Sequence, residues 1–474
     1  MTEALPAHYI RAAVVASLGT GVLGFLSDLC GVLRPAALVG RAGSSSEVRE
    51  EEMVKTIIEP SREIPVVREC DVLVVGGGPA GLAASVAAAR LGARVVLVER
   101  YGYLGGLATG GLVIWLPGFR PGGSDVYGGL ALEWVQRVER AGGTAYRDLS
   151  ETEQAVLADP ELLKSAALDI VVGAQVDTVF HAWATASVAA DGRVQGIVIE
   201  SKSGRQAILA SATVDATGDA DVAAWSGAEY VIGRKGIALD FRVGGVDWGR
   251  YLSFCVEDRD QWSTLNQDLH ERTLVSLTYG DRGRCHNDFA WFNYRGVIGW
   301  DAIDVDDLSK AEVTLRRNVL RAVEYLRERV PGFERSFLVD TASQIGTRDS
   351  RRIVGGYVLT REDLNRGATF PDSIGRICND PFVQQRFEIP YRALLPNGVE
   401  GLLVAGRPIS TEPRVHEATR LIPPSLVTGQ AAGTAAALAV RDGVSPRQVN
   451  LRQVQETLRR EGVAISNLIA NESK

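Results

Sequence analysis

Three glycines with the spacing Gly76-x-Gly78-x-x-Gly81 follow a short apolar run at residues 72–75. The run predicts a buried strand, and the alanine-rich residues after Gly81 predict a helix. We expect Gly76 to permit a tight turn, Gly78 to let a pyrophosphate approach the backbone, and Gly81 to let helix and strand pack closely. The first N–H groups of the helix and its positive dipole end would face the phosphates. The pattern predicts a dinucleotide site.

An acidic residue stands where a bound dinucleotide needs one. A second apolar run, residues 94–98, ends in Glu99, which follows Gly81 by 18 residues. A carboxylate at the end of this strand can accept a hydrogen bond from a ribose hydroxyl. A glycine-rich turn before a core helix is the alternative, but it leaves the acid without a role. Strand, glycines, helix, second strand and acid together favour the dinucleotide site.

The residues after Glu99 form a loop rich in small side chains. Such a loop suits close contact between its backbone and a flat or phosphorylated ligand. Leu107, Leu112 and Trp115 make it too apolar for an exposed flexible linker, which is the alternative. The small residues are Gly105, Gly106, Ala108, Thr109, Gly110 and Gly111.

A β-like region follows, in which Asp-Gly at 191–192 and Ser-Gly at 203–204 predict the hairpin turns of a small meander. It ends in a strand at 213–216 that delivers Thr217, Gly218 and Asp219 to its carboxyl edge. Ligands in open α/β sheets gather at this edge, so we expect these residues near the dinucleotide. An Asp-rich turn without a ligand is the alternative.

Residues 237–335 lack a regular alternation of strands and helices and contain many aromatic residues. We interpret this stretch as an inserted domain that supplies part of a pocket. Its aromatic residues are expected in a core more than on a substrate platform. Residues 314–330 predict a charged amphipathic helix that ends before Pro331. Two further amphipathic helices are expected at 128–141 and 159–170.

Arg348, Arg351 and Arg352 cluster before an apolar run at 353–359, which predicts a strand. Arginines beside buried structure must be paired, solvated or directed at a ligand. Salt bridges to nearby carboxylates and an anion-binding role are equally compatible with the sequence.

The last informative segment runs from a strand at 402–405 into Gly406 and Arg407, and then into a loop with His416 and Arg420. A helix of glycines and alanines follows two prolines. Its small side chains would allow close approach to a planar ligand, and its N-terminal dipole would stabilise negative charge. Reduced flavin carries such charge at N1–C2=O, so the helix suits flavin better than nicotinamide.

The composition excludes several classes of protein. With 46% hydrophobic and 23% charged residues, the 474-residue chain is typical of a soluble globular protein of two or three domains. A net charge of −7 and the lack of a basic stripe argue against nucleic acid as a partner. The five cysteines are dispersed without CxxC spacing and the five histidines form no ligand cluster, so no metal site and a reducing, cytoplasmic location are expected.

Residues 1–52 differ from the rest of the chain. The uncharged, mostly apolar run at 12–27 is too short and too rich in glycine for a membrane span, and membrane association is not expected. Three interpretations stay open: a dispensable extension before a natural start at Met53, a signal or anchor, and a packed element.

The chain contains, in this order, the motifs GGGPAG with Glu99, ERYGYLGGLATGGLV, VDATGDAD, GTRDSRRIVGGYVLT, IPYRALLP, and LLVAGRPIS with TGQAAGTAAALA. In these motifs, from about residue 66 to residue 442, it resembles the FAD-dependent oxidoreductase family, which is related to the succinate dehydrogenase and fumarate reductase flavoproteins. The resemblance implies an α/β fold in which a Rossmann-like, glutathione-reductase-like FAD-binding domain (53–236 and 341–474) is interrupted by an α+β cap or substrate domain (237–340).

The resemblance also implies which residues hold FAD. One group would hold the ADP part, a second would lie along the pyrophosphate, ribityl chain and flavin, a third would close on the cofactor, and a fourth would surround the flavin. In that order, the groups are Gly76, Gly78, Pro79, Ala80, Gly81, Glu99 and Arg100; Gly105, Gly106, Ala108 and Thr109; Gly218 and Asp219; and Gly406, Arg407, Gly429, Gln430 and Ala431.

The segment after Arg407 departs from the family pattern. Relatives often carry SATHEALGSVRVMP, whereas this chain has STEPRVHEATRLIPP. With Ser410 and Arg420 kept in register, Pro413 stands at the usual histidine position and His416 is displaced from it. Residues 105–109 contain no histidine that suggests a covalent flavin link, so non-covalent FAD is expected.

Missing features narrow the reaction. The sequence lacks the cysteine pair and second dinucleotide fingerprint of a disulfide reductase, and it has Ala-Gly-Arg where an aromatic hydroxylase usually has Gly-Asp-Ala. This favours an enzyme that exchanges hydride between FAD and a small organic substrate. The alternatives are an electron-transfer subunit, whose partner would supply the iron–sulfur clusters, and a structural flavoprotein. A homo-oligomer is compatible with the sequence, and the electron acceptor is not indicated.

Four residues are candidates for catalysis. Arg420 and His416 are the first, because an arginine can fix a carboxylate or other oxygen and a histidine can move a proton near neutral pH. Arg348 and Arg352 are the next. A loop histidine bonded to the backbone is the alternative for His416.

Overall fold

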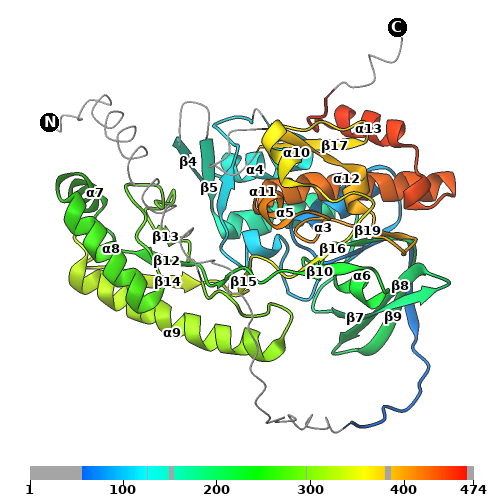
Figure 1. Ribbon diagram of the computed structural model, residues 1–474, viewed down its shortest axis with the longest axis horizontal. Coiled ribbons are helices and arrows are strands. Elements are labelled where there is room, and N and C mark those ends of the chain that lie inside the picture. The colour runs from blue at the N-terminus through cyan, green and yellow to red at the C-terminus, as the bar shows by residue number, and fades with distance from the viewer. Residues whose placement is uncertain (1–55, 125, 149–153, 295, 379–385, 467–474) are drawn as a thin grey trace, which may run out of the picture. The chain divides into compact units, whose positions relative to one another are not determined.

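The computed structural model describes residues 56–124, 126–148, 154–294, 296–378 and 386–466 (Figure 1). Residues 63–474 form one compact unit, which contains the helices and strands. The predicted extension at 1–52 lies outside the described residues, and residues 56–62 contain no helix or strand. Every helix with a described position is too short or too polar to cross a bilayer.

A mixed sheet with a parallel centre carries the fold. Its strands are β1 (Val66–Val75), β2 (Val95–Val98), β6 (Asp177–Val179), β7 (Trp183–Ala190), β8 (Arg193–Ser201), β9 (Gly204–Asp215) and β19 (Leu402–Val404). The order is β6-β2-β1-β9-β8-β7, and β19 pairs with β9. The pairs β6–β2, β2–β1, β1–β9 and β9–β19 are parallel, whereas β7, β8 and β9 form the predicted antiparallel meander. The protein therefore has a mixed α/β fold.

Strand β9 takes part in both the antiparallel meander and the parallel part of this sheet. Its residues 204–209 pair with β8, and its residues 213–215 pair with β19. β1 lies along its other side, from Val66 opposite Ala207 to Val75 opposite Asp215. The carboxyl ends of β1, β9 and β19 consequently meet at one edge, where the sequence places its candidate ligand-binding residues.

Two helices rich in small residues, α3 (Pro79–Arg90) and α12 (Ile422–Asp442), pack closely against each other. A Cβ atom on Gly429 would lie 2.1 Å from the backbone oxygen of Ala80, and one on Gly433 would lie 2.0 Å from that of Ala84. The glycines of α12 therefore serve the contact between helices, and their approach to a planar ligand stays a prediction. The two prolines expected before α12 lie within its first turn, where the missing N–H has no partner to lose.

The amphipathic helices predicted at 128–141 and 159–170 are confirmed as α4 (Gly129–Arg140) and α5 (Pro160–Gly173). Asp159 caps α5 by accepting hydrogen bonds from the backbone N–H groups of Glu161 and Leu162. The remaining elements around the main sheet are β3 (Trp115–Pro117), β4 (Thr144–Asp148), β5 (Gln154–Ala158), α6 (Asp221–Trp225), α10 (Arg361–Arg366), β17 (Ser373–Cys378), β18 (Arg386–Pro390), α11 (Pro413–Thr419), α13 (Leu451–Arg460) and the 3₁₀ turns Gly106–Ala108, Tyr391–Leu394 and Pro446–Gln448.

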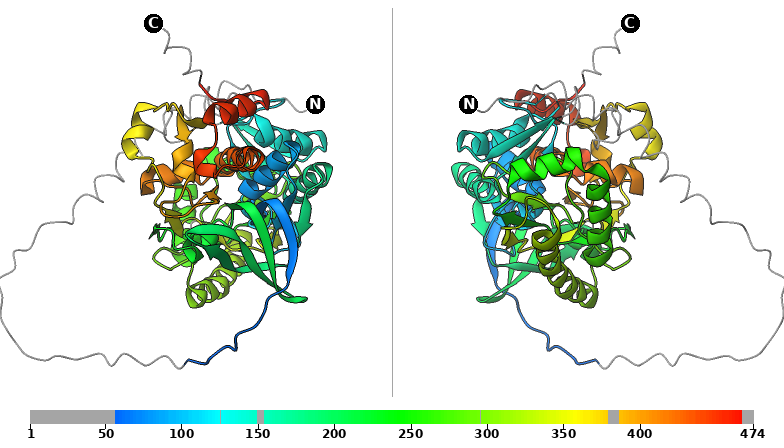
Figure 2. Two further views of the ribbon diagram at one scale, coloured as in Figure 1. Left: turned by 90° about the vertical axis from the view of Figure 1, so that its right-hand side faces the viewer. Right: turned by 90° about the vertical axis from the view of Figure 1, so that its left-hand side faces the viewer.

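Residues 237–342 contain a second hydrophobic core. A three-stranded sheet of order β13-β12-β14 packs with helices α7, α8 and α9, which Figure 2 (right) shows in green facing the viewer. Trp248, Tyr251 and Tyr294 are buried in this core, as the sequence favours for these aromatic residues. The elements are β12 (Phe241–Gly244), α7 (Trp248–Glu257), α8 (Arg259–Thr273), β13 (Ala290–Phe292), α9 (Val305–Arg329) and β14 (Phe337–Thr341).

Several predicted boundaries are wrong for local reasons. Helix α9 begins at Val305, nine residues before the predicted 314, because Asp304 caps it by accepting from the backbone N–H of Asp307. The strand predicted at 353–359 ends at Ile353, just before the chain turns through two glycines.

Four short strands link the two cores in antiparallel pairs: β10 (Tyr230–Ile232) with β16 (Arg351–Ile353), and β11 (Ile237–Ala238) with β15 (Gly346–Thr347).

Candidate functional site

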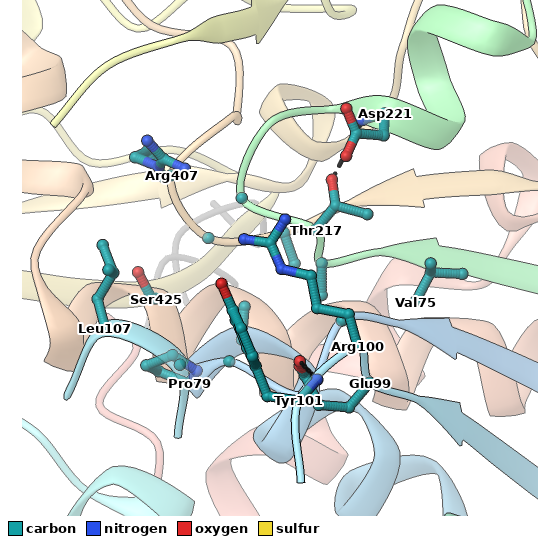
Figure 3. A pocket seen from close by; sticks show the side chains of 18 of the residues that line it. Val75, Pro79, Glu99, Arg100, Tyr101, Leu107, Thr217, Asp221, Arg407 and Ser425 are labelled. Carbon is teal, nitrogen blue, oxygen red and sulfur yellow. Dashed lines mark hydrogen bonds between the residues drawn. The ribbon is translucent and has the colours of Figure 1, made fainter. Parts of the chain in front are cut away.

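A pocket of about 930 Å³, including its open part, lies at the carboxyl edge of the main sheet (Figure 3). Its walls come from the ends of β1, β2, β9 and β19, from the first turns of α3 and α12, and from the loop after β2. In Figure 3, Leu107 and Arg407 lie to the left and Val75 and Arg100 to the right. The pocket joins segments that are far apart in the sequence.

The three motif glycines have different surroundings. A Cβ on Gly76, whose φ is +101°, would lie 2.4 Å from the backbone oxygen of Ala216, and a Cβ on Gly81 would lie 1.7 Å from that of Gly76. A Cβ on Gly78 would meet no atom within 4 Å, and Gly78 lines the pocket at the start of α3. Gly76 and Gly81 therefore hold the turn together, and Gly78 leaves open space before the helix N-terminus. This space suits a pyrophosphate group, so the residues present fit a dinucleotide.

Glu99 lies in the wall at the end of β2 and is buried. Its two carboxylate oxygens accept hydrogen bonds from the backbone N–H groups of Gly77, at 2.6 Å, and Tyr101, at 2.8 Å. Burial raises the pKa of this carboxyl, and the two backbone donors oppose the shift. Because each oxygen has a second lone pair, Glu99 can also accept from a ligand hydroxyl.

Arg100 stands beside Glu99 between two aromatic rings. Its guanidinium carbon lies 4.9 Å from the ring centroid of Tyr101 and 5.2 Å from that of Trp183. Both rings line the pocket. The sequence prediction names Arg100 but misses Trp183, since this residue reaches the site from the meander. These cation–π contacts hold the guanidinium in a part of the wall that is rich in flat groups.

The turn after β9 is held by the buried Asp215. Its carboxylate accepts hydrogen bonds from the Thr217 hydroxyl, at 2.7 Å, and from the backbone N–H of Ala223, at 3.0 Å. Gly218, with φ +83°, lines the pocket. Asp219 is absent from the pocket wall, and its carboxylate instead accepts from the Ser350 hydroxyl.

Asp219 contributes to the site through Arg407. The Arg407 guanidinium donates to Asp219 Oδ1 at 2.7 Å and to the backbone oxygen of Thr347 at 2.7 Å, and it lines the pocket. Asp219 and Arg407, both predicted as cofactor contacts, are thus brought together, but with different roles. Arg407 is held in the wall, and Asp219 and Thr347 hold it there.

Arg420 is the one candidate catalytic residue of the four that lines the pocket, where it lies near Ile422 and Ser425 of α12. Its guanidinium donates to Glu417 Oε2 at 2.6 Å. The other oxygen of Glu417 lies 2.7 Å from the ammonium nitrogen of Lys235, a residue between β10 and β11. One carboxylate is therefore shared by two cations, and Lys235 is a neighbour that the sequence prediction misses.

His416 lies on helix α11 and not on the predicted loop, and its side chain is fully buried outside the pocket wall. Its Nε2 lies 3.2 Å from the backbone oxygen of Arg407, so Nε2 carries the proton, and its Nδ1 accepts from Lys235 at 3.4 Å. Burial, and then the positive charges of Lys235, Arg352, Arg420 and Arg407, hold the pKa of His416 well below its usual value. The imidazole is neutral, and its contacts support the alternative of a histidine bonded to backbone.

This burial predicts a pH effect on stability. Because unfolding lets His416 bind a proton that the folded state refuses, the free energy of unfolding should fall as the pH drops below about 6.5, by up to about 1.4 kcal/mol per pH unit. Urea titrations from pH 7.5 to 5 should show a shallower fall for His416→Gln than for the wild type. Parallel curves for the two proteins would contradict the prediction.

The other candidate arginines lie away from the pocket wall. Arg348 donates to the backbone oxygen of Tyr294 at 2.7 Å, and Arg352 donates to that of Thr411 at 2.8 Å. Arg352 also lies 3.3 Å from Asp349, which matches the salt-bridge alternative.

Some of the predicted cofactor residues line the pocket, and others lie outside its wall. Among those absent from the wall, Thr109 donates to a backbone oxygen within its own loop, and Gln430 accepts from the backbone N–H of Leu130. Their cofactor contacts stay predictions. The predicted residues in the wall are Gly76, Gly78, Pro79, Ala80, Glu99, Arg100, Gly106, Gly218, Gly406 and Arg407, and those outside it are Gly81, Gly105, Ala108, Thr109, Asp219, Gly429, Gln430 and Ala431.

Metal ligation has no support in the described part of the chain, where no group of three or more histidine, cysteine or acidic side chains could hold an ion. The cysteines with described side chains, Cys70, Cys255 and Cys285, are buried free thiols.

Comparison with known proteins places the chain in a family. Solved structures similar to it include a geranylgeranyl bacteriochlorophyll reductase-like protein from Thermoplasma acidophilum (15% identity, 84% of each chain, TM-score 0.46). Another is the p-nitrophenol 4-monooxygenase of Pseudomonas putida (13% identity, 83% of this chain and 88% of that chain, TM-score 0.42). The family model for FAD dependent oxidoreductases matches residues 71–458, most of the 474-residue chain. The protein belongs to the FAD-dependent oxidoreductase family, and FAD is its cofactor.

Proposed function

We propose that the protein is a dehydrogenase or reductase that exchanges hydride between non-covalently bound FAD and a small organic substrate. The proposal rests on one observation: a single pocket joins the Gly78 space before α3 to the first turn of α12, with Arg420 in its wall. We further propose that residues 53–236 and 341–474 act as a glutathione-reductase-like FAD-binding domain, and that 237–340 act as its cap.

The residues at one end of the pocket would hold the adenosine and pyrophosphate. The free N–H groups at the start of α3, with Gly78 as the open approach, favour the phosphates. Glu99 would accept from a ribose hydroxyl, and Arg100 would stack on the adenine or contact a phosphate oxygen. Arg407, fixed by Asp219 and Thr347, lines the same pocket and would donate to an oxygen of the cofactor.

The residues at the other end would orient the flavin and the substrate. Bound FAD supplies the hydride chemistry. The first turn of α12, at Ile422 and Ser425, would stabilise negative charge through the helix dipole. Arg420 would bind a carboxylate or carbonyl oxygen of the substrate and hold it in place. When Arg420 binds the substrate, Lys235 would still balance the negative charge of Glu417.

Anaerobic mixing of the purified protein with a library of metabolites tests this function. We expect at least one oxidisable metabolite to bleach the flavin absorbance, or one oxidant to restore it after chemical reduction. A protein that binds FAD but exchanges electrons with no small molecule would contradict the proposal. Native co-purification with an iron–sulfur protein would then favour the electron-transfer subunit.

Arg420→Leu should lower kcat/KM for the metabolite so identified by roughly 10- to 100-fold, as expected for a hydrogen bond between charged groups. FAD content should stay unchanged.

Lys235→Met should raise KM several-fold with little effect on kcat. Without Lys235, Arg420 is the single cation that pairs with Glu417, so Glu417 competes more strongly with the substrate for Arg420. Lys310→Met, which removes an exposed partner of Asp307, is the matched control and should behave as the wild type. Wild-type kinetics for Arg420→Leu would remove this residue from the substrate site.

A further inference from the structure

Gln344 places an unpaired carbonyl in the pocket wall. Its side-chain oxygen Oε1 is buried and accepts no hydrogen bond from the described residues. Of the buried side-chain atoms without a partner, this is the one whose residue lines the pocket. An unpaired buried oxygen costs about 1–3 kcal/mol, and native proteins leave few such groups. A donor on a bound ligand would account for it.

The backbone around Gln344 is anchored on both sides. The Gln344 N–H donates to the Gly110 backbone oxygen at 2.9 Å, and the N–H of Ala342 donates to that of Asp240 at 2.9 Å. Three residues further on, the backbone oxygen of Thr347 accepts from Arg407 at 2.7 Å. The segment therefore runs from the second hydrophobic core to the pocket, and its backbone is held on both sides of Gln344. A side chain on an anchored backbone segment is suited to recognise a ligand that is itself held rigidly.

The position of Gln344 limits which N–H or O–H group of FAD could donate a hydrogen bond to its side-chain oxygen. The Gln344 backbone is bonded to Gly110, next to the loop residues that the family resemblance places along the ribityl chain and the flavin, whereas Glu99 and Arg100 would hold the adenosine. The oxidised isoalloxazine ring has a single N–H donor, N3–H, which lies between two carbonyl groups. A primary amide complements this edge, because its oxygen can accept from N3–H while its NH₂ donates to a neighbouring carbonyl.

We propose that Gln344 recognises the isoalloxazine ring of FAD through the N3–H edge. The inference rests on the proposed function, since it needs the flavin to occupy this end of the pocket. It makes Gln344 a positioning residue for the ring. It also links the second hydrophobic core to the flavin, because Gln344 belongs to the segment that leaves that core at β14.

Reconstitution of the apoprotein with FAD labelled with ¹⁵N at N3 tests the proposal. In Gln344→Leu we expect the Kd for FAD to rise about tenfold, in line with one lost hydrogen bond and an unpaired donor. The N3–H proton resonance should move upfield relative to the wild type. Ser343→Ala is the matched control on the same segment, because its hydroxyl contacts Tyr103 and Gly110 and not the pocket wall. It should keep the wild-type Kd and resonance.

Gln344→Glu gives a second, independent measurement. It keeps an acceptor oxygen and adds negative charge, so the N3–H resonance should stay downfield while the two-electron reduction potential falls. The fall would be about 30 mV for each tenfold loss of affinity for reduced relative to oxidised FAD. This variant also covers the case in which Gln344→Leu does not fold.

The outcomes separate the two proposals. An unchanged N3–H resonance in Gln344→Leu overturns the assignment to the ring, whether or not the Kd changes; a changed Kd would then point to a ribityl hydroxyl. A wild-type protein that binds FAD but exchanges electrons with no small molecule would instead overturn the proposed function.

Discussion

A Gly78→Val protein should fold as the wild type does. It should stay colourless after it has been mixed with FAD and separated from the unbound cofactor. The backbone of Gly78 is extended, with φ −66° and ψ −175°, so a valine can adopt it, and an added Cβ meets no protein atom within 4 Å. The side chain would instead fill the space before α3. We expect the Kd for FAD to rise at least about 100-fold, because a misfit in a close phosphate contact also removes hydrogen bonds to the helix N-terminus.

Gly81→Ala is the matched comparison on the same motif. Its Cβ would lie 1.7 Å from the backbone oxygen of Gly76, so the turn itself must shift. This variant should lose stability together with FAD binding, whereas Gly78→Val should lose FAD binding alone. FAD fluorescence titrations and thermal unfolding of the apoproteins measure the two effects. Near wild-type affinity in Gly78→Val would show that the phosphates pass elsewhere.

Gly433→Val should give the largest loss of stability without touching the pocket. A Cβ at this position would lie 2.0 Å from the backbone oxygen of Ala84, so α3 and α12 would have to separate. We expect the free energy of unfolding to fall by roughly 3 kcal/mol or more, at the upper end of overpacking effects. Urea titration of the apoprotein is the measurement.

The control for this substitution is Gly173→Ala at the exposed end of α5, where an added Cβ meets no atom within 4 Å. It should change stability by less than about 1 kcal/mol, and alanine's helix propensity favours a small gain. Equal stability of Gly433→Val and the wild type would mean that the two helices are further apart than described.

The sequence predicts the parts of the site that depend on short spacing. The glycine turn, Glu99 and the strand before Arg407 are each defined within a few residues, so local rules suffice. The small residues of α12 show the limit of such rules. Periodicity reports that a helix face is small, but a face that meets another helix and one that meets a ligand need the same residues.

The remaining contacts depend on tertiary structure. Trp183, Lys235 and Gln344 reach the pocket or its supports from segments without a motif, and no local signal marks them. His416 illustrates the reverse case. Its residue type suggests proton transfer, whereas its complete burial on α11 makes it a neutral support for Arg407. Only the fold distinguishes these roles, because burial and hydrogen-bond partners are set by segments distant in sequence.

The double pairing of β9 has a consequence for biosynthesis. The nascent chain presents the glycine motif early, yet β19 and the first turn of α12, which complete the pocket wall, leave the ribosome only after residue 402 of 474. Until then the carboxyl half of β9 has an unpaired edge. A complete flavin pocket therefore forms only after β19 and the start of α12 have been synthesised.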